Sequence, residues 1–426
     1  MKPNESIPPS VDDVRFADLY EREEYPVETS DGWRLIVTRY KPVVQSFEQP
    51  LFGQPIVLVH GFTQNRHAWS AGEFVKNLLY FGIDVHILEL RGHGKSSVYL
   101  QQRLHRDEGR PLPADIGYGW DIDSYFLHDV PAAVRGVKEK TGRDKIFYCG
   151  HSMGGMLGYG YAGLNDDLLG MVTVGAPSQL GRGFWPIRMV AMLDMMTPMV
   201  LSTAGVAERV WRTAQRLPRA GKGPDTPTPE SGTSGWDTRA LPFDYLLRTW
   251  GALISRSPNT GVGWLDQRIR FLYNPRRVVP ENILWLLTWG GEKEPLGVAR
   301  QFARWIRRGE LKCYRTNQDF AANYPRIQIP MAIIFGDEDR LANLASTRSI
   351  YRSVGSEYLL WRPVRGNSHM ELTMGHDIRQ ICYDIKNLME YAITHVKREP
   401  SLPKRAEGPV RTDAGTRRAR RLRIVK

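Results

Sequence analysis

Ser152 is the residue whose surroundings are best suited to nucleophilic chemistry. It lies in the stretch FYCGHSMGGMLG, between Gly150 and Gly154, directly after the short apolar run KIFYCG. A serine on a sharp turn between a strand and a helix needs small neighbours, because larger side chains there would collide with adjacent strands. The pattern in this context predicts a nucleophile, and the alternative interpretation is a small residue in a tight turn.

A serine hydroxyl is a weak nucleophile at neutral pH, so a histidine must accept its proton and a carboxylate must orient that histidine. Where the serine lies on such a turn, these partners follow it in the order acid, then histidine. The sequence supplies Asp339 in FGDEDRLAN, after the apolar run MAIIF, and His369 in RGNSHMEL, after YLLWRPV. We therefore predict a triad of Ser152, Asp339 and His369.

Each predicted partner has a rival nearby in the sequence. Asp337 stands at the end of its strand, where it could equally form the turn, whereas Asp339 lies further out in the loop. The loop VGAPSQL, which follows the strand after the nucleophile, offers no carboxylate and so favours Asp339 further. His376 begins the last expected helix beside Asp377, a typical N-capping residue. His369 and Asp339 are preferred, and the two rivals remain open.

The oxyanion that forms when a serine attacks an acyl group must be met by fixed N–H donors. One donor is expected from the backbone amide of Met153, the residue after the nucleophile. The second is expected from the amide of Phe62, because the segment HGF follows the strand PIVLV and places a glycine beside it. The alternative interpretation of HGF is an ordinary turn.

Patterns that would bind a cofactor are missing from the sequence. His60, His93 and His151 each stand next to a glycine, but none belongs to a cluster with metal-ligand spacing and supporting carboxylates. RGHGKS ends like a phosphate-binding loop, yet the position five before Gly94 holds Glu89 instead of glycine. We therefore expect no metal, nucleotide or other cofactor.

The elements that must position these residues alternate between strands and helices. A hairpin is expected from Tyr25 around the turn Ser30-Asp31-Gly32. Further strands are expected at 55–61, 83–94, 145–150, 168–177, 329–340 and 356–364, and helices at 71–80, 123–140, 153–162, 345–353 and 377–395. Repeated strand–helix–strand order with buried strands predicts a largely parallel sheet covered by helices.

The alternation breaks between Gly181 and Pro325, which contain helical apolar segments and the turn-rich stretch LPRAGKGPDTPTPESGTSG. We expect this insertion to cap the nucleophile and to shape the acyl pocket. The Met-rich segment 184–201 favours a lipid-like pocket, with plain helix packing as the alternative. Tryptophans extend the apolar character of the insertion: Trp250, Trp264, Trp285, Trp289 and Trp305.

Four parts of the chain follow from these patterns. They are an N-terminal extension (1–24), a core built from 25–180 and 326–398, the insertion (181–325), and a basic, disordered tail (399–426). The net charge is +12, and the segment 404–426 supplies +7 of it through nine Lys and Arg against two acidic residues. Such a tail would make at most peripheral contact with anionic surfaces, and no specific nucleic acid is expected.

The predicted location rests on cysteines and on the N-terminus. Cys149, Cys313 and Cys382 lie far apart, without the spacing of a disulfide framework or zinc site. The N-terminus shows no signal-peptide pattern, and no apolar stretch has the length of a membrane span. We therefore expect a reducing, cytoplasmic location.

Taken together, HGF, RGHGKS, GHSMGG, GDED and GNSH stand in an order that resembles the α/β-hydrolase superfamily over about residues 25–180 and 325–395. Within it, VETSDGWRLIVTRY, HDVPAAVRGVKEKTGRDKIFYCGHSMGG and HMELTMGHD resemble acid-lipase-like lipases and esterases. The chain departs from those lipases in its N-terminus, in Met153 where they more often have glutamine, and in RGHGKS, which is commoner among bacterial esterases.

The resemblance implies a mostly parallel central sheet flanked by helices, with a large, mainly helical cap. It also implies Ser152, Asp339 and His369 as the triad and the amides of Phe62 and Met153 as the oxyanion hole. The expected function is hydrolysis of hydrophobic carboxylic esters, lipid-like or aromatic, through an acyl-enzyme on Ser152. The alternatives are an acyltransferase or a polyester synthase or depolymerase with the same triad. A non-catalytic binding protein of this fold is disfavoured by the intact triad.

Overall fold

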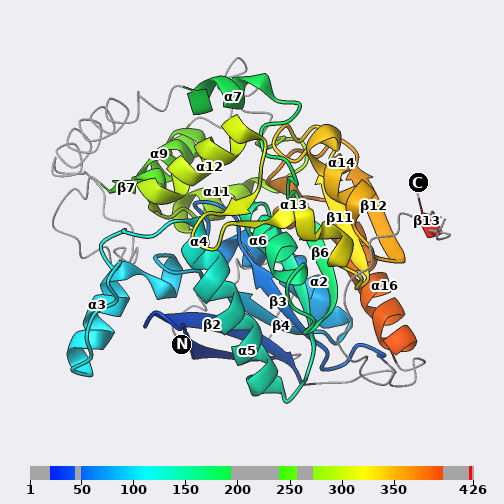
Figure 1. Ribbon diagram of the computed structural model, residues 1–426, viewed down its shortest axis with the longest axis horizontal. Coiled ribbons are helices and arrows are strands. Elements are labelled where there is room, and N and C mark those ends of the chain that lie inside the picture. Colours follow the sequence, from blue (N-terminus) through cyan, green and yellow to red (C-terminus); the bar gives the residue numbers. More distant parts are fainter. Residues whose placement is uncertain (1–19, 44–48, 193–238, 257–271, 397–421, 425–426) are drawn as a thin grey trace.

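The computed structural model describes residues 20–43, 49–192, 239–256, 272–396 and 422–424. Within these residues a nine-stranded sheet is flanked by helices on both faces, in the order β1-β2-β4-β3-β5-β6-β11-β12-β13 (Figure 1). The strands are β1 (Tyr20–Glu28), β2 (Arg34–Pro42), β3 (Pro55–Val59), β4 (Asp84–Leu88), β5 (Ile146–His151), β6 (Leu168–Val174), β11 (Met331–Gly336), β12 (Tyr358–Val364) and β13 (Leu422–Ile424).

Most of the sheet is parallel. Strands β1 and β2 form an antiparallel hairpin, and β2 also pairs with β4 in the antiparallel direction. The other pairs, which run from β4 through β3, β5, β6, β11 and β12 to β13, are parallel. Every residue of β3, β4, β5 and β11 is buried. This is the pattern of parallel strands covered on both faces, and it confirms the fold predicted from the sequence.

Side chains that alternate along each strand divide the core into two layers. Val57 and Val59 point into the layer that contains α5 (Val130–Thr141), α6 (Met153–Ala162) and α14 (Leu344–Ser353). Ile56 and Leu58 point into the opposite layer, with α2 (Phe74–Tyr80) and α16 (Ile378–Val396). Cys149 and Cys382 are buried in this second layer, so they serve as core residues.

The expected helix at 123–140 is divided in three. It consists of α4 (Ile122–Ser124), a π-helical turn (Tyr125–Asp129) and α5. The division coincides with Pro131 near the start of α5. Proline lacks the N–H that would continue the regular ladder to the fourth preceding carbonyl, so the wider turn takes up the mismatch.

The region between β6 and β11 contributes helices that gather on one side of the sheet (Figure 1). They are α7 (Trp185–Met192), α9 (Phe243–Arg256), α11 (Pro280–Trp289), α12 (Leu296–Arg308) and α13 (Phe320–Asn323), with two short strand pairs, β7–β8 (Ala240–Leu241, Glu294–Pro295) and β9–β10 (Lys312–Cys313, Gln318–Asp319). Trp305 is almost fully buried and belongs to the main core, so this tryptophan packs the insertion against the core.

Several sequence predictions lie at or beyond the edges of the described residues. β1 begins at Tyr20, inside the expected extension 1–24. The turn-rich stretch 217–235, Trp264 and half of the Met-rich segment (193–201) lie outside the described residues, as does the basic tail apart from β13, which pairs with β12. Among the helices that the structure describes, none combines the length and the apolar character needed to cross a bilayer.

Candidate active site

Ser152 lies at the sharp turn between β5 and α6, as the glycine pattern predicts. Its backbone has φ of 50° and ψ of −117°, a left-handed conformation that is strained for any residue other than glycine. A Cβ on Gly150 would lie 2.4 Å from the backbone of Gly154, and one on Gly154 would lie 2.3 Å from the carbonyl oxygen of Val59. The elbow therefore fits only with glycine at both positions.

Ser152, His369 and Asp339 lie in one hydrogen-bonded chain. Oγ of Ser152 is 2.9 Å from Nε2 of His369, and Nδ1 of His369 is 2.7 Å from Oδ2 of Asp339. Oδ1 of Asp339 accepts the backbone N–H groups of Leu341 at 2.7 Å and Ala342 at 2.9 Å. These contacts place a proton on Nδ1 and leave Nε2 free to accept the serine proton.

The two rivals lie elsewhere. Asp337 is exposed, and its Oδ1 accepts the N–H of Gly366 at 2.7 Å, so it joins the loop after β11 to the loop after β12. His376 is also exposed, and its backbone N–H donates to the carbonyl of Arg277 at 2.9 Å. The hydrogen-bonded chain at Ser152 therefore contains Asp339 and His369 and neither rival.

The two amides expected to form the oxyanion hole lie on segments beside Ser152. Met153 is the first residue of α6, where backbone N–H groups have no acceptor within the helix. A Cβ on Gly61 would lie 3.0 Å from Cβ of Ser152, so the loop that carries Phe62 passes directly against the serine. The Phe62 ring packs edge-on against Phe243 and Phe302 of the insertion, each at 5.3 Å between ring centroids.

His151 is a site residue whose role the sequence did not indicate. It is fully buried, its Nδ1 is 2.9 Å from Oε1 of Gln64, and its Nε2 is 3.2 Å from the carbonyl oxygen of His369. Burial and the neighbouring His369 lower the pKa of His151 to about 3. His151 therefore stays neutral, so only one of its two ring nitrogens donates, and its ring lies between the loop that carries Gln64 and the loop that carries His369.

The motif RGHGKS, which the sequence excluded as a nucleotide loop, has a structural role at Arg91. The Arg91 guanidinium is fully buried and bonds to Asp129 at 2.6 Å, Asp31 at 2.6 Å and Asp115 at 2.8 Å. Three carboxylates from separate segments thus accept from one guanidinium, whose buried charge and N–H groups need such partners. This cluster fixes the loop after β4.

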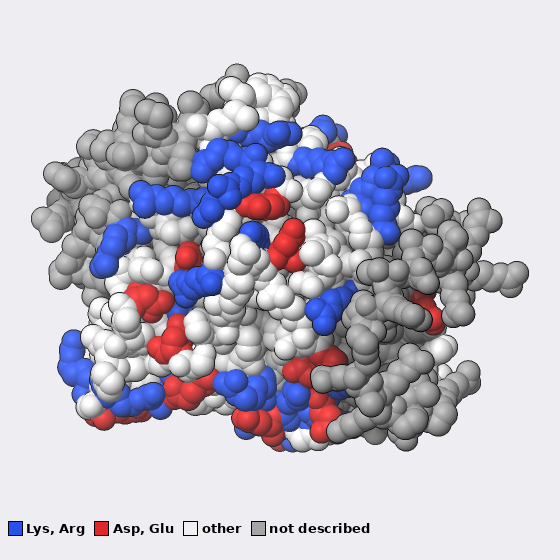
Figure 2. Space-filling model, in the orientation of Figure 1, with Lys and Arg blue, Asp and Glu red and all other residues white. Residues whose placement is uncertain are grey.

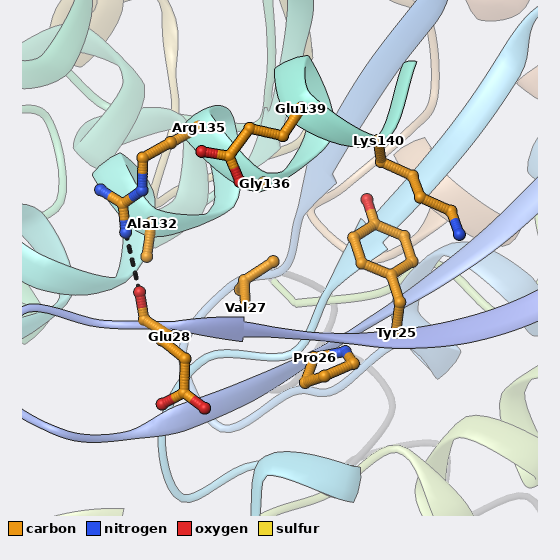
Figure 3. Close-up of a pocket in the computed structure, with 9 residues that line it drawn as sticks. All are labelled: Tyr25, Pro26, Val27, Glu28, Ala132, Arg135, Gly136, Glu139 and Lys140. Atoms are coloured by element: carbon orange, nitrogen blue, oxygen red, sulfur yellow. Dashed lines mark hydrogen bonds between the residues drawn. The ribbon is translucent and has the colours of Figure 1, made fainter. Parts of the chain in front are cut away.

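A groove of about 500 Å³ lies away from Ser152, between β1 and α5 (Figure 3). Its basic residues are engaged, since Nη2 of Arg135 donates to the carbonyl of Glu28 at 2.8 Å and the Lys140 ammonium lies 5.3 Å from the centre of the Tyr25 ring.

Among the residues that the structure describes, no three His, Cys, Asp or Glu side chains are grouped to hold a metal ion.

The strand order, the serine elbow and the hydrogen-bonded chain agree with a comparison of the sequence with known protein families. A family model described as the α/β hydrolase fold matches residues 54–211, which include β3, the elbow and β6. The chain has the α/β-hydrolase fold. This confirms the fold and the superfamily resemblance predicted from the sequence.

Proteins similar to this chain include named acid lipases. A tear acid lipase-like protein of Mesocricetus auratus is 24% identical over 149 residues, covering 35% of this chain and 36% of the relative. The lysosomal acid lipase/cholesteryl ester hydrolase of Homo sapiens is 28% identical over 142 residues, covering 32% and 33%. The chain thus matches about a third of each relative's length, and the acid-lipase-like resemblance is confirmed for that part.

A solved structure of a thermophilic esterase from Thermogutta terrifontis aligns with a TM-score of 0.47 and 16% identity, covering 87% of this chain and 99% of that chain.

The comparisons correct the predicted cytoplasmic location, which was wrong. The relatives just described are named for tear fluid and for the lysosome, and none of them indicates the cytoplasm. The prediction failed because cysteine spacing and N-terminal composition constrain the compartment only indirectly.

Proposed function

We propose that this protein is a serine hydrolase that cleaves hydrophobic, lipid-like carboxylic esters through an acyl-enzyme on Ser152. The observation that carries the proposal is the hydrogen-bonded chain from Ser152 through His369 to the buried carboxylate of Asp339. A base within 2.9 Å of the hydroxyl, oriented by a third group, is the arrangement that makes a serine nucleophilic.

In the acylation step, Oγ of Ser152 attacks the ester carbonyl while Nε2 of His369 takes the hydroxyl proton. The carboxylate of Asp339 stabilises the resulting imidazolium. The amides of Phe62 and Met153 donate to the oxyanion, and collapse of the tetrahedral intermediate breaks the ester bond as His369 returns the proton to the leaving alcohol.

In deacylation, a water molecule loses a proton to Nε2 of His369 and attacks the acyl carbon. A second oxyanion forms against the same two amides. Ser152 then leaves with the proton from His369, which frees the carboxylic acid and restores the starting state. His151, neutral beside His369, adds no second positive charge when the imidazolium forms.

The surface of the insertion supports a hydrophobic substrate. On α7, Trp185 is 74% exposed, Met192 59% and Met189 49%. Uncharged surface at this end of the molecule adjoins a band of Lys and Arg side chains (Figure 2). Exposed large apolar side chains grouped on one helix mark a contact surface for apolar partners. The names of the relatives, which include a cholesteryl ester hydrolase, agree with lipid esters as substrates.

We also propose that residues 181–325 form a cap over a core of 25–180 and 326–398, the limits predicted from the sequence. The support is the packing of Phe243 of α9 and Phe302 of α12 on the ring of Phe62. Two helices of the insertion thus cover the loop that carries the proposed oxyanion amide.

Labelling with a fluorophosphonate tests the proposal directly. The wild-type protein should be labelled once, on the peptide that contains Ser152, and Ser152→Ala should be neither labelled nor active on p-nitrophenyl esters. A folded wild-type protein that resists the label would refute it. Product analysis with added alcohol separates hydrolysis from acyl transfer, because an acyltransferase would form the new ester in preference to the acid.

A further inference from the structure

The loop that carries the Phe62 amide has a backbone conformation that neighbouring groups must hold. Residues 61–64 form a tight turn in which the N–H of Gln64 donates to the carbonyl of Gly61 at 3.3 Å. Thr63, within this turn, has φ of 62°. This left-handed region is unfavourable for a β-branched residue and persists only where the surroundings fix it.

A segment of the insertion fixes both backbone polar groups of Thr63. Its N–H donates to Oε1 of Glu294 at 2.7 Å, and its carbonyl accepts the N–H of Glu292 at 2.8 Å. Glu294 is fully buried and stands 231 residues beyond Thr63, just before α12. The insertion therefore supplies atoms that determine the shape of the turn beside Ser152.

A buried cation holds Glu294. His93, in the motif RGHGKS, directs Nε2 to Oε1 of Glu294 at 3.0 Å and Nδ1 to the carbonyl of Arg91 at 2.8 Å. Both acceptors lack a proton, so both ring nitrogens donate only when the ring is charged. Tyr125 donates its hydroxyl to the other oxygen of Glu294 at 3.2 Å.

The charge of His93 agrees with its surroundings. Burial lowers the pKa of His93, but the charge and hydrogen bond of Glu294, the charge of Glu292 and the carbonyl of Arg91 together outweigh it and raise the pKa to about 9. The titratable groups that face the ring are Glu294, Glu292, His60 and Tyr125. The ion pair therefore persists at neutral pH.

The Phe62 N–H lies between two peptide planes that are held in place. The N–H of Gly61 donates to Oε1 of Gln64 at 2.9 Å, and the N–H of Thr63 is held by Glu294. Each residue has only two soft backbone dihedrals, so fixing the planes on both sides restricts the direction of the N–H between them.

We propose that Glu294, paired with His93, is a positioning residue that aims the Phe62 N–H at the oxyanion. This inference rests on the proposed function, because it needs an oxyanion at Ser152. Glu294 does not touch the substrate and acts through Thr63.

Glu294→Leu tests the inference, because it removes the acceptor of the Thr63 N–H together with the charge that His93 faces. Removing a donor from an oxyanion hole costs about 10²–10³ in kcat, so a misdirected donor should lower kcat on a p-nitrophenyl ester about tenfold to hundredfold. KM should stay within about twofold, since the lost contact forms only in the transition state. The inhibition constant of a trifluoromethyl ketone, whose adduct with Ser152 carries the oxyanion, should rise in step with the fall in kcat.

Gln301→Leu is the matched control. Gln301 also joins α12 to the core, through the carboxylate of Asp123 at 2.6 Å and the N–H of Ile122 at 2.9 Å, and the hydrogen bonds that the structure gives it go to residues outside the turn at 61–64. It should lower thermal stability without the loss in kcat or the weaker ketone binding. Equal effects of the two variants on kcat and ketone binding would overturn the inference.

Two outcomes separate this inference from the proposed function. A wild-type protein that neither hydrolyses esters nor labels at Ser152 would refute the proposed function, whereas an active wild-type protein with an unchanged Glu294→Leu would refute only the role of Glu294. If Glu294→Leu loses the native circular-dichroism spectrum, Glu294→Asp replaces it. That variant keeps the charge but withdraws the carboxylate from Thr63 by one methylene, and a folded form with wild-type kcat would overturn the inference.

Discussion

Asp339→Asn is the substitution that tests the proposed site most sharply, because the structure dictates how the asparagine must sit. Oδ1 of Asp339 accepts two backbone N–H groups, from Leu341 at 2.7 Å and from Ala342 at 2.9 Å. An asparagine must direct its carbonyl oxygen to these donors, since its NH₂ group would oppose them. The NH₂ group then faces Nδ1 of His369, 2.7 Å from the present Oδ2.

This arrangement reverses the tautomer of the histidine. Nδ1 of His369 must accept from the amide, so the ring proton moves to Nε2, which faces Oγ of Ser152 at 2.9 Å. The ring can no longer take the serine proton. A histidine held in the wrong tautomer lowers kcat about ten-thousandfold in a serine triad, which corresponds to about 5 kcal/mol of transition-state stabilisation.

The assay is kcat and KM for p-nitrophenyl butyrate, together with the rate of fluorophosphonate labelling of Ser152. Asp337→Asn is the control, because its amide oxygen can still accept the N–H of Gly366 and its activity should stay near wild type. If a folded Asp339→Asn keeps more than a tenth of the wild-type kcat, the reasoning is refuted. If Asp337→Asn shows the larger loss, Asp337 is the acid.

Three further predictions concern the elbow, the ion pair and the insertion. Gly154→Ala should cost about 2–4 kcal/mol of unfolding free energy in urea, since its Cβ would lie 2.3 Å from a carbonyl oxygen of β3. The folded pKa of His93 is raised to about 9, so the stability from its pairing with Glu294 is complete below pH 6.5 and is lost as the pH rises through 9. Melting temperature should therefore fall between pH 7 and pH 10 more steeply in the wild type than in Glu294→Gln. Phe302→Ala should change KM across a series of acyl chain lengths, because it removes the ring that packs on Phe62, and equal KM ratios along the series would contradict this.

The parts of the site that the sequence predicted depend on local patterns. The elbow needs only glycines around Ser152 and a strand before it, and Asp339 and His369 each follow a recognisable strand in a short loop. Buried strands are also local signals, because runs such as PIVLV are apolar throughout. The sequence missed α3 (Val98–Asp107) because its mean composition is polar. The signal available for it was the N-capping side chain of Ser97, which accepts the N–H of Leu100.

The parts that the sequence did not predict depend on contacts between distant residues. His93 and Glu294 are separated by 201 positions, and His151 meets the carbonyl of a residue 218 positions away. Neither the hydrophobic pattern nor a motif around His93 or His151 indicates which distant residue it contacts. The sequence predicted no metal cluster at His93, and a single ion pair between two loops leaves no pattern in the spacing of residues.

The insertion and the core are coupled through the turn beside Ser152. The ring of Phe62 packs on two helices of the insertion, while the backbone at Thr63 is held by Glu292 and Glu294 from the same region. A change that shifts α12 would therefore act on the Phe62 ring and on the adjacent amide together. Substrate preference and transition-state stabilisation would not vary independently in such an arrangement, because Glu294 lies in β8 directly before α12 and Phe302 lies on α12. The proposed coupling would make the insertion part of the catalytic apparatus as well as a cover over it.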